Sequence, residues 1–444
     1  MARLFGTDGV RGIANKELTS ELAMNIGAAC AEVLTKNKDN VTVIIGNDGR
    51  ESADMLVSSL IAGFTKVGVN VMNIGIIPTP AISYLITKYK VDAGVMVTAS
   101  HNPYEYNGIK IFDSNGYKLP DDLEDEIESY INNKTNYNTD KLGRIIESKD
   151  GVNDYIEYLL STNNYNLKNL NIGIDCANRA SSVTADKLFN KTNCNYKIIN
   201  NNINGININE GCGALHVDKL SKYVVENNLD GGVAFDGDAD RAIFVDEKGN
   251  IIDGDYILAI MGKYLKNNNR LNNNTIVGTV MSNLGFIKYC KENNINFIAT
   301  KVGDRYVLEE MKIGNFTLGG EQSGHIILSN YSKTGDGQLT ALNVFNVLAE
   351  TNKKFSELSS IMQKYPQVLV NAKVSNNKKN EFYTNEIIQE EIRMIEKELD
   401  DNGRIVVRPS GTEPLIRVMV EGEDIKTIKD IANGLASLIE KALN

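Results

Sequence analysis

The sequence predicts an α/β protein made of three similar mixed α/β sheet domains and a smaller C-terminal α+β domain. Short β-branched runs alternate with helix-length amphipathic segments up to about residue 360, which is the pattern of βαβ units and largely parallel sheets. Three buried runs, at 41–50, 170–178 and 275–283, each end in a glycine or polar turn and precede a helical segment. This weak internal repeat indicates three related domains.

Domain boundaries follow from the chain length and from polar linkers. A chain of 444 residues is too long for one hydrophobic core. Polar segments lie near 141–155, 247–254 and 362–368. After them the pattern changes to a strand, a charged helix at about 381–399, two strands and a final helix from about 424, which indicates a separate α+β unit. We therefore expect domain I at 1–150, domain II at 151–250, domain III at 251–365 and domain IV at 366–444.

Composition excludes several classes of partner. The 47 Lys and Arg against 57 Asp and Glu give a net charge of −10, which repels nucleic acid and anionic membranes. No segment has the uninterrupted apolar length of a membrane span, and the N-terminus lacks the apolar stretch of a signal peptide. The five cysteines are scattered without a CxxC pair, so neither a disulfide framework nor a zinc site is indicated. We expect a cytoplasmic protein with no nucleic-acid or membrane partner.

Ser100 lies in the segment VTASHNP (97–103), where a buried apolar run ends in a loop. In most such loops a serine hydroxyl only caps the backbone as an ST-turn. The alternative is a nucleophile or a phosphate carrier at the carboxyl end of a sheet strand, where open α/β folds place their chemistry. Lys110 in NGIK and Arg11 in FGTDGVRG are weak signals when taken alone, because a basic residue there is usually a solvated surface residue.

The segment FDGDADR (235–241) holds the most informative acidic cluster. Asp236, Asp238 and Asp240 alternate along it, so an extended or tightly curled chain points the three carboxylates the same way. Crowded like charges are costly unless a cation neutralises them. A calcium loop is one alternative, although Arg241 stands where such a loop needs glycine, and a structural acidic turn is another. A magnesium site is favoured, since Mg²⁺ suits a few carboxylates plus a phosphate oxygen.

Two further segments carry polar groups suited to a sugar phosphate. GGEQSGH (319–325) clusters a carboxylate, a hydroxyl and an imidazole that could face sugar hydroxyls, but a glycine-rich turn with incidental polar residues explains it equally well. RPSGTEPLIR (408–417) offers two guanidiniums, two hydroxyls and a flexible glycine, a set suited to a phosphate dianion. The alternative there is a hairpin whose hydroxyls only cap the turn.

Five motifs in this order closely resemble those of the α-D-phosphohexomutase superfamily. They are FGTDGVRG, TASHNP, DGDADR, GGEQSGH and RPSGTEPLIRVMVEGED, and the resemblance spans Leu4 to about Asp424. It implies four domains around a central cleft in which one motif from each domain meets. It also implies that Ser100 carries a phosphoryl group and that one Mg²⁺ per subunit is held against it.

The resemblance assigns a role to residues of each motif. The implied catalytic residues are Ser100, His101, Lys110, Arg11 and Arg241; the metal ligands are Ser100, Asp236, Asp238 and Asp240; the sugar-binding residues are Glu321, Ser323 and His325; and the phosphate-binding residues are Arg408, Ser410, Gly411, Thr412 and Arg417. A homodimer and an activating phosphorylation of Ser100 are compatible with the resemblance.

The implied reaction moves the phosphoryl group from Ser100 to a sugar phosphate, giving a 1,6-bisphosphate that turns over in the cleft and returns its other phosphate. Gln322 is similar to the members that interconvert glucosamine 6-phosphate and glucosamine 1-phosphate, which feed UDP-N-acetylglucosamine and cell-wall synthesis. Tyr106 is closer to phosphomannomutases and phosphoglucomutases, the alternative within the superfamily. A phosphatase and a noncatalytic sugar-phosphate sensor are the rivals outside it.

Overall fold

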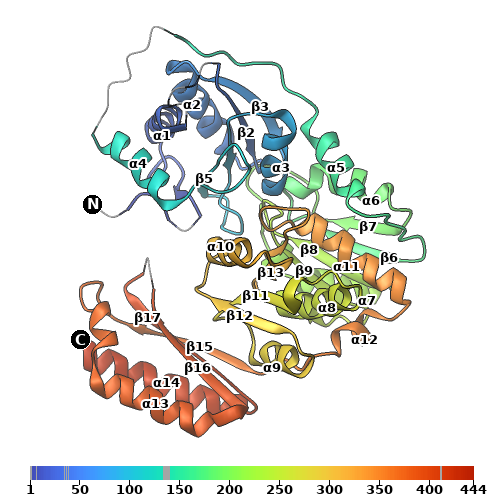
Figure 1. Ribbon diagram of the computed structural model, residues 1–444, viewed down its shortest axis with the longest axis vertical. Helices are drawn as coiled ribbons and strands as arrows, with labels where there is room; N and C mark the ends of the chain where they lie inside the picture. The colour runs from blue at the N-terminus through green and yellow to red at the C-terminus, as the bar shows by residue number, and fades with distance from the viewer. Residues whose placement is uncertain are drawn as a thin grey trace.

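The described part of this computed structural model contains four β-sheets, and the strands of each sheet come from one continuous stretch of the chain. The C-terminal sheet belongs to a separate lobe (Figure 1). The structure describes residues 3–6, 8–34, 36, 38, 40–133, 141–410 and 413–444. The strands of the first three sheets are β1 (Val10–Ile13), β2 (Thr42–Asn47), β3 (Asn70–Ile76), β4 (Ala93–Val97), β5 (Tyr106–Phe112), β6 (Asn171–Asp175), β7 (Asn195–Ile199), β8 (Gly231–Phe235), β9 (Ala242–Asp246), β10 (Ile251–Ile252), β11 (Thr275–Thr279), β12 (Asn296–Thr300), β13 (Leu318–Gly320) and β14 (Ile326–Leu328).

The first three sheets repeat one topology. In each, a first strand lies between two parallel neighbours, and a fourth strand pairs antiparallel with the third. The strand orders are therefore β5-β4-β2-β3, β9-β8-β6-β7 and β14-β13-β11-β12, with β1 and β10 added as edge strands to the first two. The three buried runs of the sequence become β2, β6 and β11, the first strand of each repeat. The predicted three similar α/β domains are confirmed.

Helices cover these sheets and begin at residues suited to cap them. Asp150, Asp253, Asn283 and Asp336 each accept a backbone N–H of the first helical turn, which satisfies an otherwise unpaired donor. The helices of the first three domains are α1 (Ser20–Leu34), α2 (Ala53–Lys66), α3 (Thr79–Tyr89), α4 (Asp121–Asn132), α5 (Gly151–Ser161), α6 (Ala185–Asn190), α7 (Asp218–Glu226), α8 (Gly254–Asn267), α9 (Leu284–Glu292), α10 (Asp304–Gly314), α11 (Gly337–Thr351) and α12 (Phe355–Ser359).

One hydrophobic core runs through all three domains, while each sheet also has a cluster of its own. Strand side chains alternate between the two faces of a sheet, so Ile44 of β2 joins the shared core and its neighbours Val43 and Ile45 pack against α1 and α2. The shared core continues through Phe244 of domain II and Ile276 of domain III. This common packing fixes the three sheets relative to one another.

Domain IV is an antiparallel sheet of order β15-β17-β16 with two helices and its own core. The predicted order of strand, helix, two strands and helix is confirmed. The charged helix begins at Glu386 rather than near 381, because Asn385 caps it and a 3₁₀ turn precedes it. No helix in the described ranges is long and apolar enough to cross a membrane. The elements are β15 (Gln367–Lys373), α13 (Glu386–Leu399), β16 (Gly403–Pro409), β17 (Leu415–Gly422) and α14 (Ile425–Leu443).

Candidate active site

Three of the sequence motifs occupy the same place in the structural repeat. The serine loop (98–105) joins β4 to β5, the metal loop (236–241) joins β8 to β9, and the sugar loop (321–325) joins β13 to β14. In each domain this is the connection from the third, parallel strand to the fourth, antiparallel strand. A fourth loop, the phosphate loop (410–414), joins β16 to β17 in domain IV.

Ser100 is held in an unusual conformation at the boundary between domains I and II. Its φ is 52°, in the left-handed region that residues other than glycine rarely adopt, and its side chain is buried. The Oγ donates a hydrogen bond of 2.6 Å to Asp236 Oδ2 of the metal loop and lies 3.3 Å from His101 Nδ1. The serine of one domain is thereby placed directly on the acidic cluster of the next.

The three aspartates of the metal loop fit a divalent cation. One carboxylate oxygen from each of Asp236, Asp238 and Asp240 lies within 4.8 Å of the others, and all three residues are buried. The Oδ1 atoms of Asp238 and Asp240 are buried without a hydrogen-bond partner. Buried carboxylate oxygens are costly when unpaired, and oxygen donors of this kind are what Mg²⁺ prefers. These residues therefore have the chemistry of a cation site.

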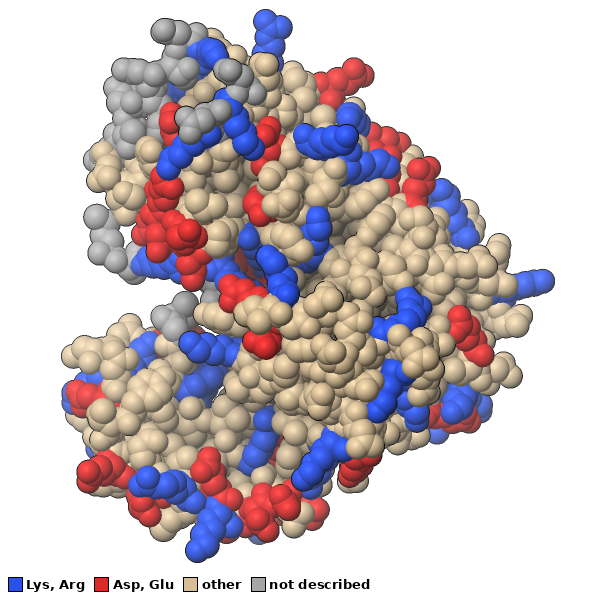
Figure 2. All heavy atoms as spheres, viewed as in Figure 1, with Lys and Arg blue, Asp and Glu red and all other residues tan. Residues whose placement is uncertain are grey.

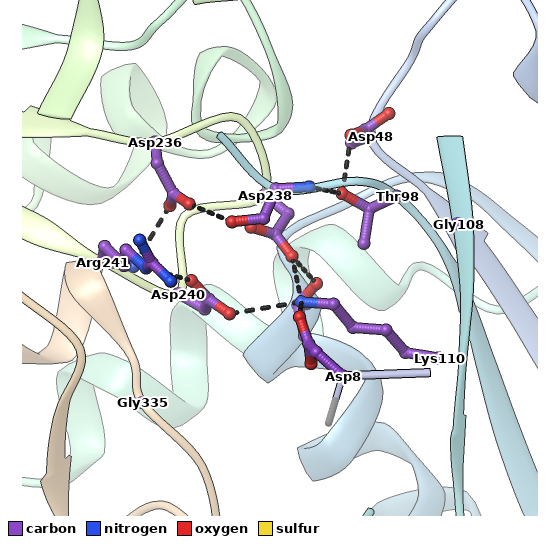
Figure 3. A network of polar contacts seen from close by, with 12 residues as sticks. Asp8, Asp48, Thr98, Gly108, Lys110, Asp236, Asp238, Asp240, Arg241 and Gly335 are labelled. Carbon is purple, nitrogen blue, oxygen red and sulfur yellow. Dashed lines mark hydrogen bonds and ion pairs between the residues drawn. The ribbon is translucent and has the colours of Figure 1, made fainter. Parts of the chain in front are cut away.

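Lys110 enters the same cluster from β5 (Figure 3). Its Nζ lies 2.9 Å from Asp238 Oδ2, 3.1 Å from Asp8 Oδ2 and 3.3 Å from Asp240 Oδ2. Burial lowers the pKa of Lys110, but the three carboxylates outweigh it and raise the pKa well above its ordinary value. Lys110 is therefore a fixed positive charge within the acidic cluster to which Ser100 is bonded.

The two ends of the acidic cluster differ in their affinity for protons. Burial and the charges of Asp240 and Asp238 raise the pKa of Asp236 well above its usual range. Burial acts in the same direction on Asp240, but Lys110 and other cations around it hold its pKa well below the usual range.

Burial and the charges of Arg241 and Arg11 lower the pKa of His101 to about 4, so its ring is neutral at pH 7.

The sugar loop divides into an outer and an inner part. Ser323 is exposed, and Glu321 Oε1 accepts the amide N–H of Gly303 at 3.2 Å. His325, by contrast, is 2% exposed; its Nε2 accepts the Gly335 amide N–H at 2.9 Å, and its Nδ1 lies 3.7 Å from Asp240 Oδ2. The sequence grouped His325 with the sugar-binding residues, whereas the structure places it beneath the loop, against the metal loop.

The phosphate loop presents two arginines from adjacent strands. Arg408 and Arg417 are direct cross-strand partners, and burial together with the charge of Arg417 lowers the pKa of Arg408. Arg417 Nη2 also donates to Glu413 Oε2 at 2.6 Å, and Ser410 Oγ accepts the Glu413 amide N–H at 3.1 Å. Two guanidiniums this close favour an anion between them. Gly411 and Thr412 lie outside the described residues.

A hollow opens between domain IV and domain I, on the left of the view, and basic side chains lie on its walls (Figure 2). Within the described chain, the hydrogen bonds that tie domain IV to domain III run through Glu421 and Arg404. These residues lie at the ends of β16 and β17 remote from the phosphate loop. The structure thus brings the serine and metal loops into contact, whereas the loop ends of β16 and β17 belong to a separate lobe (Figure 1).

The site also contains residues to which the sequence motifs assign no role. Asp8 contacts Arg11, Lys110 and Lys118, and Lys118 Nζ also lies 2.5 Å from Asp304 Oδ2, which joins domain I to domain III. At the metal loop, Thr79 Oγ1 donates to Asp238 Oδ2. At the serine loop, the side chains of Arg50 and Asn209 donate to the carbonyl of Ser100. At the phosphate loop, Lys379 Nζ donates to the carbonyls of Ser410 and Glu413. Asp8 stands inside FGTDGVRG and Arg50 at a strand end, so local signals existed for these two.

Family models match the chain domain by domain. The models of phosphoglucomutase/phosphomannomutase α/β/α domains I, II and III match residues 2–138, 153–249 and 253–365, and the model of the C-terminal domain matches 369–438. A relative from Caldanaerobacter subterraneus subsp. tengcongensis named phosphoglucosamine mutase is 55% identical over 447 residues, with 100% of each chain covered. A relative of the same name from Clostridium botulinum is 53% identical over 445 residues, with 99% of each chain covered.

Solved structures share the fold at low sequence identity. A phosphoglucomutase/phosphomannomutase family protein from Burkholderia thailandensis has a TM-score of 0.82 at 22% identity, covering 99% of this chain and 97% of that one. The Aspergillus fumigatus N-acetylphosphoglucosamine mutase in complex with GlcNAc-6P and magnesium has a TM-score of 0.69 at 17% identity, covering 99% of this chain and 96% of that one. At these identities the likeness shows the fold alone.

Proposed function

The chain belongs to the phosphoglucomutase/phosphomannomutase family, and we propose that within it the protein interconverts glucosamine 6-phosphate and glucosamine 1-phosphate. The reaction uses a phosphorylated Ser100 and a glucosamine 1,6-bisphosphate intermediate. The relatives named phosphoglucosamine mutase, which match over the full chain, support the choice of sugar.

The observation that carries the proposal is the hydrogen bond from Ser100 Oγ to Asp236 inside the buried acidic cluster. Phosphoryl transfer depends mainly on positioning and on neutralising the charge of the phosphoryl oxygens. Lys110 is a buried cation in the same acidic cluster, and the charges of Arg11 and Arg241 act on His101 next to this serine. A serine so placed can pass a phosphoryl group without a base-activated triad.

Asp236, Asp238 and Asp240, together with an oxygen on Ser100, would hold Mg²⁺. When bound, the ion supplies positive charge to the transferring phosphoryl group. His325 supports this loop from below, because its ring packs against Asp240. Thr79 and Lys110 donate to Asp238 from the domain I side, so both flanks of the metal loop are oriented by the chain itself.

The reaction also needs a site for the phosphate that does not react. In both half-reactions one phosphate of the sugar is remote from Ser100, so a single site can serve each orientation. Arg408, Ser410 and Arg417 offer charge-assisted hydrogen bonds suited to that phosphate. The binding energy of the remote phosphate then positions the reacting end of the sugar. Glu321 is an acidic group suited to the ammonium of an amino sugar.

The test is a comparison of sugars with purified protein, Mg²⁺ and a sugar 1,6-bisphosphate. We expect kcat/KM for glucosamine 6-phosphate to exceed that for glucose 6-phosphate and mannose 6-phosphate by at least about tenfold, which is about 1.4 kcal/mol of discrimination. A preference for mannose 6-phosphate would instead make the protein a phosphomannomutase. Release of inorganic phosphate without sugar 1-phosphate would make it a phosphatase.

Three attributes complete the proposal. The reaction takes place in the cytoplasm, in keeping with five cysteines that are all buried and free. The protein works as a homodimer, which sedimentation of the purified protein would test. Ser100 receives its first phosphoryl group from a kinase or from a sugar bisphosphate, and intact-mass measurements after incubation with glucose 1,6-bisphosphate would show whether the second source suffices.

A further inference from the structure

We infer that Arg50 and Asn209 are positioning residues that grip the serine loop from two domains and direct the phosphoryl group of Ser100 to the sugar rather than to water. The inference rests on the proposed function, because it concerns the same phosphoserine. Neither residue belongs to the motifs that carry the reacting groups, and both bind the backbone carbonyl of Ser100 rather than its hydroxyl.

Arg50 is a buried guanidinium that binds four carbonyl groups of the serine loop and of the strand that follows it. Its side chain is completely buried. Nη2 donates to Ser100 O at 2.8 Å, and Nη1 donates to the carbonyls of Asn102, Pro103 and Tyr106 at 2.9, 2.6 and 3.0 Å. Nη1 carries two N–H groups, so one of them is shared between two of its three carbonyls, whereas a lysine would have to serve the whole set from a single nitrogen. The loop is therefore wrapped around Arg50.

The amide side of Ser100 is tied to the same buried pair. Arg50 Nε donates to Asp48 Oδ2 at 2.9 Å, and that oxygen also accepts the Thr98 hydroxyl at 2.7 Å. Thr98 Oγ1 in turn accepts the Ser100 amide N–H at 2.9 Å. Both backbone groups of Ser100 thus lead to the Asp48–Arg50 pair. A left-handed serine persists only where its surroundings hold it, and these bonds supply the hold.

Asn209 grips the same loop from domain II. Its Nδ2 donates to Ser100 O at 3.0 Å and to Asn102 O at 3.4 Å. The residue is 7% exposed to solvent. The metal loop packs on the same carbonyl, because a Cβ added at Gly237 would lie 2.5 Å from Ser100 O. The carbonyl of Ser100 is therefore fixed by both domains, and its hydroxyl is left facing Asp236.

This arrangement fixes the line along which the phosphoryl group leaves Ser100. In transfer, the Oγ–P bond breaks as a P–O bond forms to a sugar hydroxyl, and the proton lost by that hydroxyl ends on the departing Ser100 oxygen, which becomes a free hydroxyl. In hydrolysis a water oxygen takes the place of the sugar hydroxyl, and the products are inorganic phosphate and the free Ser100 hydroxyl. A loosened loop misaligns the phosphoryl group with the bound sugar, which slows transfer, while water can attack from any open side. The sugar contacts are on other domains, so KM should change little.

The experiment compares Arg50→Lys and Asn209→Ala with wild type. Arg50→Lys keeps a charge beside Asp48 but cannot serve four carbonyls, and Asn209→Ala removes the grip of domain II alone. We expect kcat to fall at least about tenfold with KM within about twofold. We also expect the ratio of inorganic phosphate to sugar 1-phosphate to rise at least about fivefold, and the phosphorylated enzyme to lose its phosphate faster without sugar, as followed by intact mass.

Asn343→Ala is the matched control. Asn343 is also 7% exposed, and its Nδ2 also donates to two acceptors, Tyr165 Oη and Leu339 O, far from the serine loop in the chain. It should lower the thermal midpoint without changing the phosphate ratio. If the Asn209 variant behaves as this control does, both residues are merely structural and the inference is wrong.

Each outcome decides something. If Arg50→Lys fails to fold, Asn209→Ala carries the test. If wild type forms sugar 1-phosphate and both variants keep its phosphate ratio, the inference fails while the proposed function stands. If wild type releases only inorganic phosphate from every sugar phosphate, the proposed function fails, and the inference with it.

Discussion

Glu421→Gln should loosen the junction that orients the phosphate loop. Glu421 is completely buried in β17, where its carboxylate accepts the side chain of Asn283 at 2.9 Å, the amide N–H of Leu284 at 3.0 Å and Arg404 Nε at 2.5 Å. Two of these donors belong to domain III. The same strand pair continues to the phosphate arginines, since the Arg404–Glu421 pair is followed by the Arg408–Arg417 pair four residues along.

The magnitude follows from the number of donors. Glutamine has one acceptor oxygen in place of two, so its NH₂ group faces at least one donor in either orientation. A hydrogen bond to a charged group contributes about 1.5–3 kcal/mol, and breaking a buried ion pair costs about 3–5 kcal/mol. Arg404 keeps its bond to the Ser282 carbonyl and is partly exposed, which reduces the cost. We expect the docking of domain IV onto domain III to lose about 2–3 kcal/mol, which is about thirtyfold to 150-fold in kcat/KM because substrate binding needs the docked domain.

The assay measures kcat/KM for glucosamine 6-phosphate and the thermal unfolding of the same samples. Glu390→Gln on α13 is the control, because the Glu390–Arg393 pair is exposed on the same domain and such pairs contribute little. It should leave both measurements unchanged. If Glu421→Gln also keeps the wild-type kcat/KM and thermal midpoint, the junction does not position the phosphate loop, and the reasoning from the strand pair is wrong.

The remaining predictions address the site and the core. Ser100→Ala should reduce mutase turnover to background, and phosphopeptide mapping of active wild type should find the phosphate on Ser100; substantial turnover of the variant would contradict a phosphoserine. Chelation with EDTA should abolish turnover and Mg²⁺ should restore it, whereas equal turnover of metal-free protein would exclude the cation site. Arg417→Ala should lower kcat/KM about tenfold to a hundredfold, since it removes charge-assisted hydrogen bonds to phosphate, and an unchanged kcat/KM would show that domain IV does not bind the sugar phosphate. Burial raises the pKa of Asp336 to about 6, so the folded chain binds a proton that the unfolded chain releases near pH 4. The contribution of this group to the free energy of unfolding is therefore lost as pH rises through 6. Between pH 5 and pH 7 the free energy of unfolding of wild type should fall by about 1 kcal/mol more than that of Asp336→Asn. Parallel pH dependences of the two free energies, measured by denaturation, would refute this.

Periodicity and turn signals were sufficient to predict the three-domain repeat. The runs that became β2, β6 and β11 are buried on both sides by parallel neighbours, so they appear in the sequence as continuous apolar segments bounded by turns. The start of α13 was less predictable, because the 3₁₀ turn before it also carries charged residues, Lys379 and Glu381, and no proline or glycine separates it from the helix. The domain boundaries expected from the polar linkers stay predictions.

The candidate site was predictable only where its chemistry is concentrated in one short segment. The alternating spacing of the three aspartates in the metal loop is enough to indicate a cation site. Asn209, by contrast, lies in an asparagine-rich stretch and is identified only by the carbonyls it reaches in another domain. His325 is a second case, since its burial and its position against Asp240 could not be inferred from a glycine-rich loop, and its assignment to sugar binding stays a prediction. Sequence spacing cannot report a contact that depends on how two domains pack.

The repeat explains why these loops can meet at all. In each of the first three domains the loop in question follows the third strand, which is parallel to the first, and the chain then reverses into a fourth, antiparallel strand. Copies of one topology packed on a shared core present that reversal toward a common space, so three different chemistries could be placed on equivalent loops without changing the sheets. The spacing from the end of the first strand to the loop differs between domains, which hides the equivalence in the sequence. The precise geometry of the site must then come from contacts between domains. Arg50 of domain I and Asn209 of domain II both donate to the Ser100 carbonyl, and these hydrogen bonds fix the serine loop relative to both domains.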